Sequence, residues 1–237
     1  MEHFLKAKWQ KLIMANYAVE PAVLTPFLPN HTELDFFKGK VYVSLVGFMF
    51  MNSKIAGVPI PLMGSFEEVN LRFYVKRKVD GAWRRGVVFV NETVPYKLVA
   101  VVANWLYKEH YTAIPTKHEW RNEGDSQHVN YFWKKDGNWN EIRLEAALES
   151  QAMEKGSVEE FIFEHYYGYT RVDATHTEEY RIEHPSWEIY PIKNYGISCD
   201  FKTMYGESFA HLRSQQPNSI MLAEGSDIAV KWKRNRL

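Results

Sequence analysis

Three polar side chains alternate with large apolar ones between residues 66 and 75. Glu68, Asn70 and Arg72 are spaced two apart, with apolar residues between them. Successive side chains of a β-strand point to opposite faces, so a strand here presents an acid, an amide and a guanidinium on one face. An unpaired charge is costly to bury, so this face must border water or a polar cavity. The spacing therefore predicts a lined pocket.

These three side chains support two interpretations. In the first, Arg72 binds the carboxylate of a small-molecule ligand with two hydrogen bonds, Glu68 acts as a catalytic acid or base, and Asn70 orients the bound group. In the second, a buried Glu–Arg ion pair joins two strands of a ligand-free structural or interaction barrel, and Asn70 satisfies backbone groups, although apolar residues would close such a wall at lower cost. The spacing alone leaves both interpretations open.

Several other chemistries have no signature in the sequence. The nine histidines include no pair at the His-x-x-x-His or His-Glu-x-x-His spacing of a metal-binding helix. Cys199 is the single cysteine, which rules out an internal disulfide and a cysteine metal cluster. The chain also lacks a glycine-rich phosphate loop, a nucleophile elbow and a dinucleotide fingerprint. We therefore expect no metal and no cofactor.

The charge balance bears on the kind of partner. Lys+Arg and Asp+Glu both number 29, so the formal net charge is zero. A neutral chain has no general attraction for a phosphate backbone or an anionic membrane, so we expect neither nucleic acid nor a membrane as partner. No signal-type segment follows Met1 and no apolar run reaches transmembrane length, which predicts a cytoplasmic protein. The sequence leaves homo-oligomerisation open.

The elements that must position the polar strand are mostly strands. Runs of β-branched and aromatic residues, separated by turn residues, predict ten or more strands and three short helices. Asp80-Gly81 predicts a tight hairpin directly after the polar strand. Without a repeat or a linker, residues 1–237 are expected to form a single mainly β domain, either an antiparallel barrel or two packed sheets.

Three further segments carry specific expectations. Residues 96–107 predict a helix that is apolar on nearly every side, so we expect it to lie buried across the sheet. Ser157 and Glu160 form a capping box that predicts a short helix from Val158. Residues 171–184 are expected to form one strand.

Aromatic residues make up 15% of the chain. Seven of them are candidates to line a cavity, although most should belong to the core, because large rings dominate protein cores. These candidates are Phe48, Phe50, Trp105, Tyr107, Tyr111, Trp133 and Tyr167.

The polar strand also carries a family resemblance. Phe66-Glu-Glu-Val-Asn-Leu-Arg-Phe-Tyr-Val75 resembles the Phe-x-Glu-x-Asn-x-Arg-x-Tyr-Val signature of the YqjF-like bacterial proteins, a family of unknown function. Weaker matches extend the resemblance over nearly the whole chain. They are Trp9, the helix between Pro21 and Pro29, and residues 161–169, 183–187 and 224–228.

The resemblance implies a fold and a third functional alternative. YqjF-like proteins look like relatives of acetoacetate decarboxylase, which is a β-rich cone or barrel of antiparallel strands with a few short helices around a small-molecule cavity. That enzyme forms a Schiff base between a lysine and a keto acid. Where it has Pro-Lys-Lys, this chain has Pro95-Tyr96-Lys97. The resemblance thus makes Lys97 a candidate catalytic residue of a Schiff-base decarboxylase.

One departure from the family concerns position 165. The family usually shows Glu-Arg-Tyr after the short helix, and this chain has Glu164-His165-Tyr166. If the family arginine helps to bind an anionic group, that role is weaker here. The candidates are then Glu68 and Lys97 for catalysis, with Glu68, Asn70, Arg72, Tyr107 and His165 for binding a compact acid or carbonyl compound.

Overall fold

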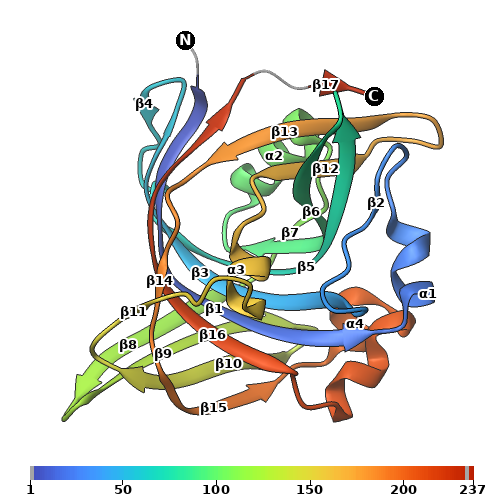
Figure 1. The fold of residues 1–237 in the computed structure, drawn as a ribbon. Helices are drawn as coiled ribbons and strands as arrows, with labels where there is room; N and C mark the ends of the chain where they lie inside the picture. Colours follow the sequence, from blue (N-terminus) through green and yellow to red (C-terminus); the bar gives the residue numbers. More distant parts are fainter. Residues whose placement is uncertain (1–2, 233–234) are drawn as a thin grey trace.

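Long β-strands form two sheets that share a core (Figure 1). The computed structural model describes residues 3–232 and 235–237. The strands are β1 His3–Val19, β2 Glu33–Leu34, β3 Val41–Ile55, β4 Val58–Pro59, β5 Phe66–Val79, β6 Ala82–Val94, β7 Tyr111–Ala113, β8 Thr116–Glu123, β9 Ser126–Lys135, β10 Asn138–Ala147, β11 Gln151–Ala152, β12 Tyr167–Arg171, β13 Thr177–Glu183, β14 Glu188–Ile189, β15 Ile192–Ser198, β16 Ser219–Lys231 and β17 Asn235–Arg236. The helices are α1 Pro21–Leu24, α2 Lys97–Tyr107, α3 Val158–Phe163 and α4 Phe201–Tyr205, with 3₁₀ segments η1 Thr25–Phe27 and η2 Glu207–Ser214.

Seven strands of the larger sheet close into a ring. Their order is β16, β1, β3, β5, β6, β12 and β13, and β13 pairs again with β16 through Ile182 with Val230 and Glu183 with Ala229. The pairings around the ring are antiparallel except for β6 with β12, which is parallel. Figure 1 looks into this ring. The mainly β fold predicted from the sequence is confirmed.

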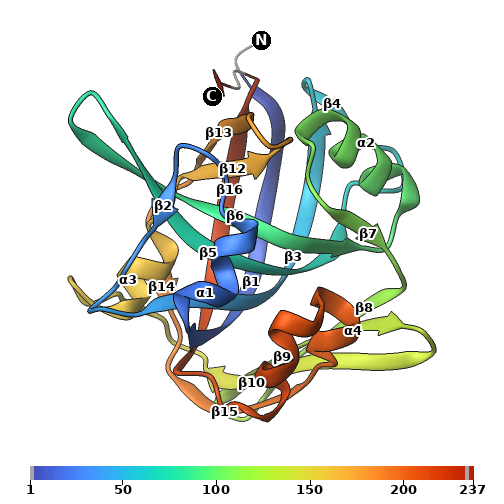
Figure 2. The same ribbon diagram turned by 90° about the vertical axis from the view of Figure 1, so that its right-hand side faces the viewer.

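The outer face of the ring packs on a smaller antiparallel sheet of β8, β9, β10 and β15 (Figure 2). Val69, Leu71 and Phe73 of β5 are fully buried there, in one cluster with Tyr131 and Trp133 of β9. This core is formed by the apolar residues that alternate with the polar trio. The same alternation turns the trio to the other face, toward the interior of the ring.

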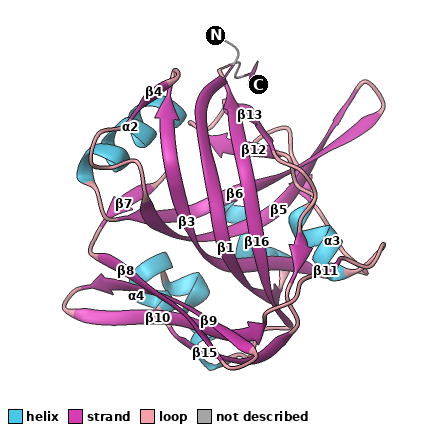
Figure 3. Cartoon of the chain, turned by 90° about the vertical axis from the view of Figure 1, so that its left-hand side faces the viewer, coloured by secondary structure: helices cyan, strands magenta, loops and turns pink. Residues whose placement is uncertain are grey.

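A second apolar cluster fills part of the ring interior. It joins Phe48 of β3 and Tyr74 of β5 to Phe161 of α3 and Ala100 of α2. The capping box predicted for α3 is present, because Ser157 accepts a bond from the Glu160 backbone N–H at 3.1 Å. Figure 3 shows the ring strands and the smaller sheet of β8, β9, β10 and β15 from another side.

Helix α2 has the predicted extent but not the predicted burial. Its side chains Leu98, Val101 and Trp105 are 57%, 63% and 72% exposed. The expectation of a helix buried across the sheet is wrong, because the ring covers one face of α2 and no other described element covers the outer face. Among the residues described, no helix has both the length and the apolar character that crossing a bilayer requires.

Two turns show what local sequence controls. Asp80 and Gly81 both have positive φ angles of 50° and 83°, as the predicted hairpin between β5 and β6 requires. The strand expected over residues 171–184 is instead a hairpin of β12 and β13. Asp173 Oδ1 accepts bonds from the backbone N–H groups of Thr175 and His176 at 2.8 and 2.9 Å, which stabilises this turn.

Candidate functional site

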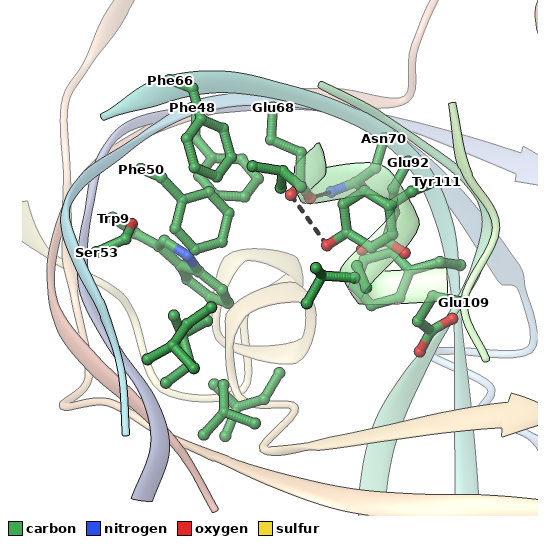
Figure 4. A pocket seen from close by; sticks show the side chains of 18 of the residues that line it. Trp9, Phe48, Phe50, Ser53, Phe66, Glu68, Asn70, Glu92, Glu109 and Tyr111 are labelled. Atoms are coloured by element: carbon green, nitrogen blue, oxygen red, sulfur yellow. Dashed lines mark hydrogen bonds between the residues drawn. The ribbon is translucent and has the colours of Figure 1, made fainter. Parts of the chain in front are cut away.

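Strand β5 brings the polar trio to a cavity of about 230 Å³ inside the ring (Figure 4). Glu68, Asn70 and Arg72 all line this cavity. Asn70 Nδ2 donates a hydrogen bond to Glu68 Oε1 at 2.9 Å. The Tyr111 hydroxyl donates to Glu68 Oε2 at 3.2 Å, and Figure 4 shows these two side chains pointing toward each other. Glu68 is therefore held in place by one amide and one phenol.

A bulge in β6 adds a second carboxyl group to the cavity. Asn70 lies opposite Glu92, whereas Arg72 lies opposite Phe89, so β6 has one extra residue between the two pairs. Phe89 and Glu92 consequently line the same cavity although they are three residues apart. The Oε2 atom of Glu92 is buried without a hydrogen-bond partner among the described residues.

A third carboxyl group comes from the turn after α2. Lys108 ends this helix in the left-handed conformation, with φ 58°, and the chain then turns into β7. Glu109 follows and lines the cavity. Its Oε1 accepts bonds from the hydroxyls of Thr170 at 2.5 Å and Tyr180 at 2.9 Å, which belong to β12 and β13.

Burial sets the charge of these three carboxyl groups. Loss of hydration raises the pKa of Glu68 to about 7, against the hydrogen bonds that it accepts. Burial also raises the pKa of Glu109 to about 7. The pKa of Glu92 is raised well above its usual range, first by burial and then by the neighbouring Glu109 and Glu68. Near neutral pH the cluster therefore retains protons, and a protonated carboxyl group can donate a hydrogen bond.

Arg72 is the one cationic side chain among the described residues that line the cavity. Its guanidinium lies 5.7 Å from the ring centre of Tyr74, and Nη2 lies 3.5 Å from the sulfur of Met14. Within the described chain no carboxylate lies within 4.0 Å of it, and its buried Nε has no partner. The guanidinium thus keeps donors that a ligand can use.

The other side of the cavity is aromatic (Figure 4). The Trp9 ring meets Phe48 and Phe50 edge-on with centroids 5.2 and 5.9 Å apart, and Phe50 stacks on Phe66 at 5.0 Å. Helix α2 lines the same cavity with Leu98, Val99, Val102 and Ala103. The cavity therefore has an apolar half and a half rich in carboxyl groups.

The structure does not bring Lys97 to this site. Lys97 is the exposed first residue of α2 and does not line the cavity. Tyr107 ends the same helix, and its side chain lies outside the part of the chain that the structure describes. Of the other aromatic candidates, Phe48, Phe50 and Tyr111 line the cavity, whereas Trp133 is buried in the core between the sheets.

His165 lies in a separate buried cluster. Its Nε2 is 3.3 Å from Oδ2 of Asp35, which also accepts a bond from Arg85 Nε at 2.6 Å. Burial lowers the pKa of His165 to about 4, despite the opposing effect of Asp35. His165 is not among the cavity-lining residues. The described residues also contain no group of three or more His, Cys, Asp or Glu side chains that could hold a metal ion.

Sequence reasoning did not assign Glu92 and Glu109 to the site. Glu92 gives a weak signal, because it is an acid near the end of an otherwise apolar strand. Strict alternation from Phe89 would nevertheless place Glu92 on the opposite face, and the bulge reverses this. Glu109 lies in a turn, where no periodicity exists to indicate a facing direction.

The ring of strands and its cavity define a class of protein. The structure is similar to an acetoacetate decarboxylase-like enzyme from Sphingomonas wittichii RW1, with a TM-score of 0.66 and 11% identity over 100% of this chain and 94% of that one. It is also similar to the enduracididine biosynthesis enzyme MppR complexed with pyruvate, with a TM-score of 0.70 and 10% identity over 98% of this chain and 90% of that one. Acetoacetate decarboxylase from Legionella pneumophila is also similar, with a TM-score of 0.64 and 10% identity over 99% of this chain and 87% of that one. At these identities the likeness shows an acetoacetate-decarboxylase-like fold, as the resemblance predicted.

The sequence comparisons identify the family. The model of the DUF2071 family, described as an uncharacterized conserved protein, matches residues 6–227, and the chain belongs to this family. It is 27% identical to the uncharacterized protein YqjF of Bacillus subtilis (strain 168) over 171 residues, which cover 70% of this chain and 67% of that protein. The predicted YqjF-like membership is therefore confirmed.

Proposed function

We propose that this protein is a cytoplasmic small-molecule protein whose cavity binds and chemically activates a compact, largely apolar compound with a carbonyl or carboxylate group. The observation that carries the proposal is a set of unsatisfied polar atoms. Glu92 Oε2, Asn70 Oδ1 and Arg72 Nε are all buried without a partner among the described residues, and all three side chains line the same cavity. Buried polar groups are normally paired, and a ligand in the cavity would supply partners for all three.

The chemistry of the walls supports a carbonyl or carboxylate head group. Arg72 donates to a carboxylate, and the protonated carboxyl groups of Glu68 and Glu92 donate to a carbonyl oxygen. The Tyr111 hydroxyl donates to Glu68 Oε2 at 3.2 Å and so orients this carboxyl group beside the bound compound. Glu68, with a pKa raised to about 7, is suited to act as general acid or base near neutral pH. MppR, which has the same fold, is complexed with pyruvate, a small keto acid.

The two other interpretations of the sequence receive less support. The ligand-free structural or interaction barrel requires a buried ion pair between a glutamate and Arg72. No carboxylate of the described residues lies within 4.0 Å of Arg72. A Schiff base requires an amine in the cavity, and no lysine is among the described lining residues. Borohydride treatment with pyruvate or acetoacetate should therefore leave Lys97 unmodified, whereas a trapped adduct on Lys97 would restore the decarboxylase alternative.

The test is ligand-dependent stabilisation. We expect small keto acids, screened by thermal shift from pyruvate to phenylpyruvate, to raise the melting temperature by about 5 °C near saturation. In Arg72→Ala the shift should fall below about 1 °C, while Arg121→Ala, which removes an exposed arginine of β8, should keep it. A screen in which no acid or carbonyl compound shifts the wild type, or shifts both variants equally, would refute the proposal.

A further inference from the structure

Exposed apolar side chains are concentrated beside the cavity. Eleven large apolar side chains of the described chain are exposed, and five of them lie in two short segments. Val58 and Leu62 belong to residues 53–64, and Leu98, Val101 and Trp105 belong to α2. Leu62 is 98% exposed. We call residues 53–64 and 97–108 together the cavity rim, because Ile60 and Met63 of the first segment and Leu98 and Val99 of the second line the cavity.

The exposed residues of α2 form one stripe. Leu98, Val101 and Trp105 are spaced three and four apart, so they project from the same side of the helix. Val99 and Val102 line the cavity from the adjoining side. Leu98 is both exposed and part of the cavity wall, so the apolar surface continues from the outside of the molecule into the cavity.

The charges of the cavity rim have one sign. The rim contains Lys54, Lys97 and Lys108, all exposed, and no aspartate or glutamate. The zero net charge of the whole chain, from which the sequence predicts no membrane partner, averages over this uneven distribution. A surface that combines exposed apolar side chains, lysines and a tryptophan has the composition of surfaces that insert into the headgroup layer of a bilayer.

We propose that the cavity rim docks on an anionic lipid surface. Anionic headgroups complement the three lysines, and Leu62, Val101 and Trp105 enter the boundary between headgroups and acyl chains. A second copy of this chain fits less well, because a two-fold contact between rims would bring like-charged lysines together. Helix α2 has 11 residues and lies along the lipid surface.

Docking would place the exposed edge of the cavity wall at Leu98 against the lipid. An apolar ligand can then pass from the membrane along Leu98 into the aromatic half of the cavity without crossing water. This route rests on the proposed function of the cavity. The docking itself does not, because it depends only on the exposed residues of the rim.

Vesicle flotation tests the docking on the full chain without any ligand. The wild type should float with phosphatidylcholine vesicles rich in phosphatidylglycerol and not with pure phosphatidylcholine vesicles, and added salt should release it. Lys54→Ala/Lys97→Ala/Lys108→Ala should weaken partitioning roughly a hundredfold, and Leu62→Asp/Trp105→Asp at least about tenfold. All five side chains are exposed, so these variants should keep the wild-type melting temperature.

The chain offers a matched control. Trp83, in the hairpin between β5 and β6, is 47% exposed and has Lys76 and Lys78 over its ring, so it combines an apolar side chain with lysines away from the cavity. Trp83→Asp should float like the wild type.

Three results would overturn the docking. One is a wild type that does not float with the anionic vesicles, and another is flotation that the rim variants leave unchanged. The third is a wild-type dimer, measured by light scattering, that Trp105→Asp converts to a monomer, which would assign the rim to a second copy. Because keto-acid binding is measured in solution without vesicles, failure of either proposal is recognised independently of the other.

Discussion

Two buried acidic sites in this protein, Glu179 and the cavity pair of Glu68 and Glu92, differ in their partners. Glu179 on β13 is 1% exposed and is contacted by Arg77 at 3.1 Å and Arg84 at 2.6 Å. Glu68 and Glu92 are each 2% exposed, and no cation of the described residues lies within 4.0 Å of either. All three side chains are nearly inaccessible to solvent, and of the three Glu179 alone is paired with cations of the described chain.

Hydrogen bonds and ion pairs outweigh burial at Glu179, whereas burial outweighs the hydrogen bonds at Glu68. Burial alone would raise the pKa of Glu179, but bonds from Asn235 and Tyr169 and the charge of Arg84 outweigh it, and the net pKa is lowered. In the cavity, burial prevails and the pKa of Glu68 is raised to about 7. Glu179 is a buried acid that the surrounding structure pairs with two arginines. The cavity leaves its acids partly unsatisfied, which is the pattern expected of a site that completes its hydrogen bonds with a ligand.

The largest effect should come from removing the cations of the paired acid. Arg77→Met/Arg84→Met leaves Glu179 buried without its two cations, so the free energy of unfolding at pH 7 should fall by about 3 kcal/mol. Urea denaturation measures this loss. The exposed Arg121 on β8 provides the control, and Arg121→Met should change stability by less than about 0.5 kcal/mol. A comparable loss in both variants would show that Glu179 does not depend on its arginines.

An intermediate effect should come from neutralising a cavity acid, and it should depend on pH. Since the folded pKa of Glu68 is raised from 4.5 to about 7, its folded state binds more protons, and stability falls as pH rises between these values. Glu68→Gln removes this loss, so the variant should gain about 1–3 kcal/mol on the wild type between pH 4.5 and pH 7. Urea denaturation across this range checks the gain.

Glu179→Gln is the matched comparison for this pH series. The pKa of Glu179 is lowered, so its contribution to stability is present above the ordinary glutamate pKa and is lost as pH falls through the folded pKa. The variant should therefore be less stable than the wild type near neutral pH, and this deficit should shrink in acid. If the two substitutions gave the same pH dependence, the contrast between the two groups of acids would be wrong.

The smallest effect should come from the phenol beside Glu68. Tyr111→Phe removes a bond of 3.2 Å that favours the ionised carboxylate, so the pKa of Glu68 should rise further and stability at pH 8 should fall by about 1 kcal/mol. Tyr131→Phe is the control, because the Tyr131 hydroxyl donates to the backbone oxygen of Lys11 at 2.8 Å. That variant should lose a similar amount at every pH. A pH-independent loss in Tyr111→Phe would instead give its hydroxyl a purely structural role.

Much of the polar strand could be predicted from local rules. Alternation along β5 places Glu68, Asn70 and Arg72 on one face, whatever the rest of the chain does. Asp80-Gly81 adopts the positive φ angles that its hairpin needs, and Ser157 caps α3 through its own backbone neighbourhood. Each of these features depends on residues within a few positions of one another, so the sequence carries them directly.

The remaining parts of the site depend on pairings between distant segments. His165 illustrates this dependence, because its position after α3 carries no information about Asp35, which is 130 residues away and binds its ring. Helix α2 illustrates it in another way. Its composition fits a buried helix, and its exposure follows from the absence of a described element over its outer face.

By itself, the sequence determined the strand-rich fold and the face shared by an acid, an amide and a guanidinium, because backbone geometry over a few residues sets these properties, and its signature residues identified the family. Tertiary structure alone decided that Glu92 and Glu109 join them, since a bulge in β6 and the turn after α2 acquire their direction from long-range strand pairing. It also decided that no cation of the described chain pairs with Glu68 or Glu92. That outcome depends on where the closure of the ring places each side chain, and no local pattern encodes it.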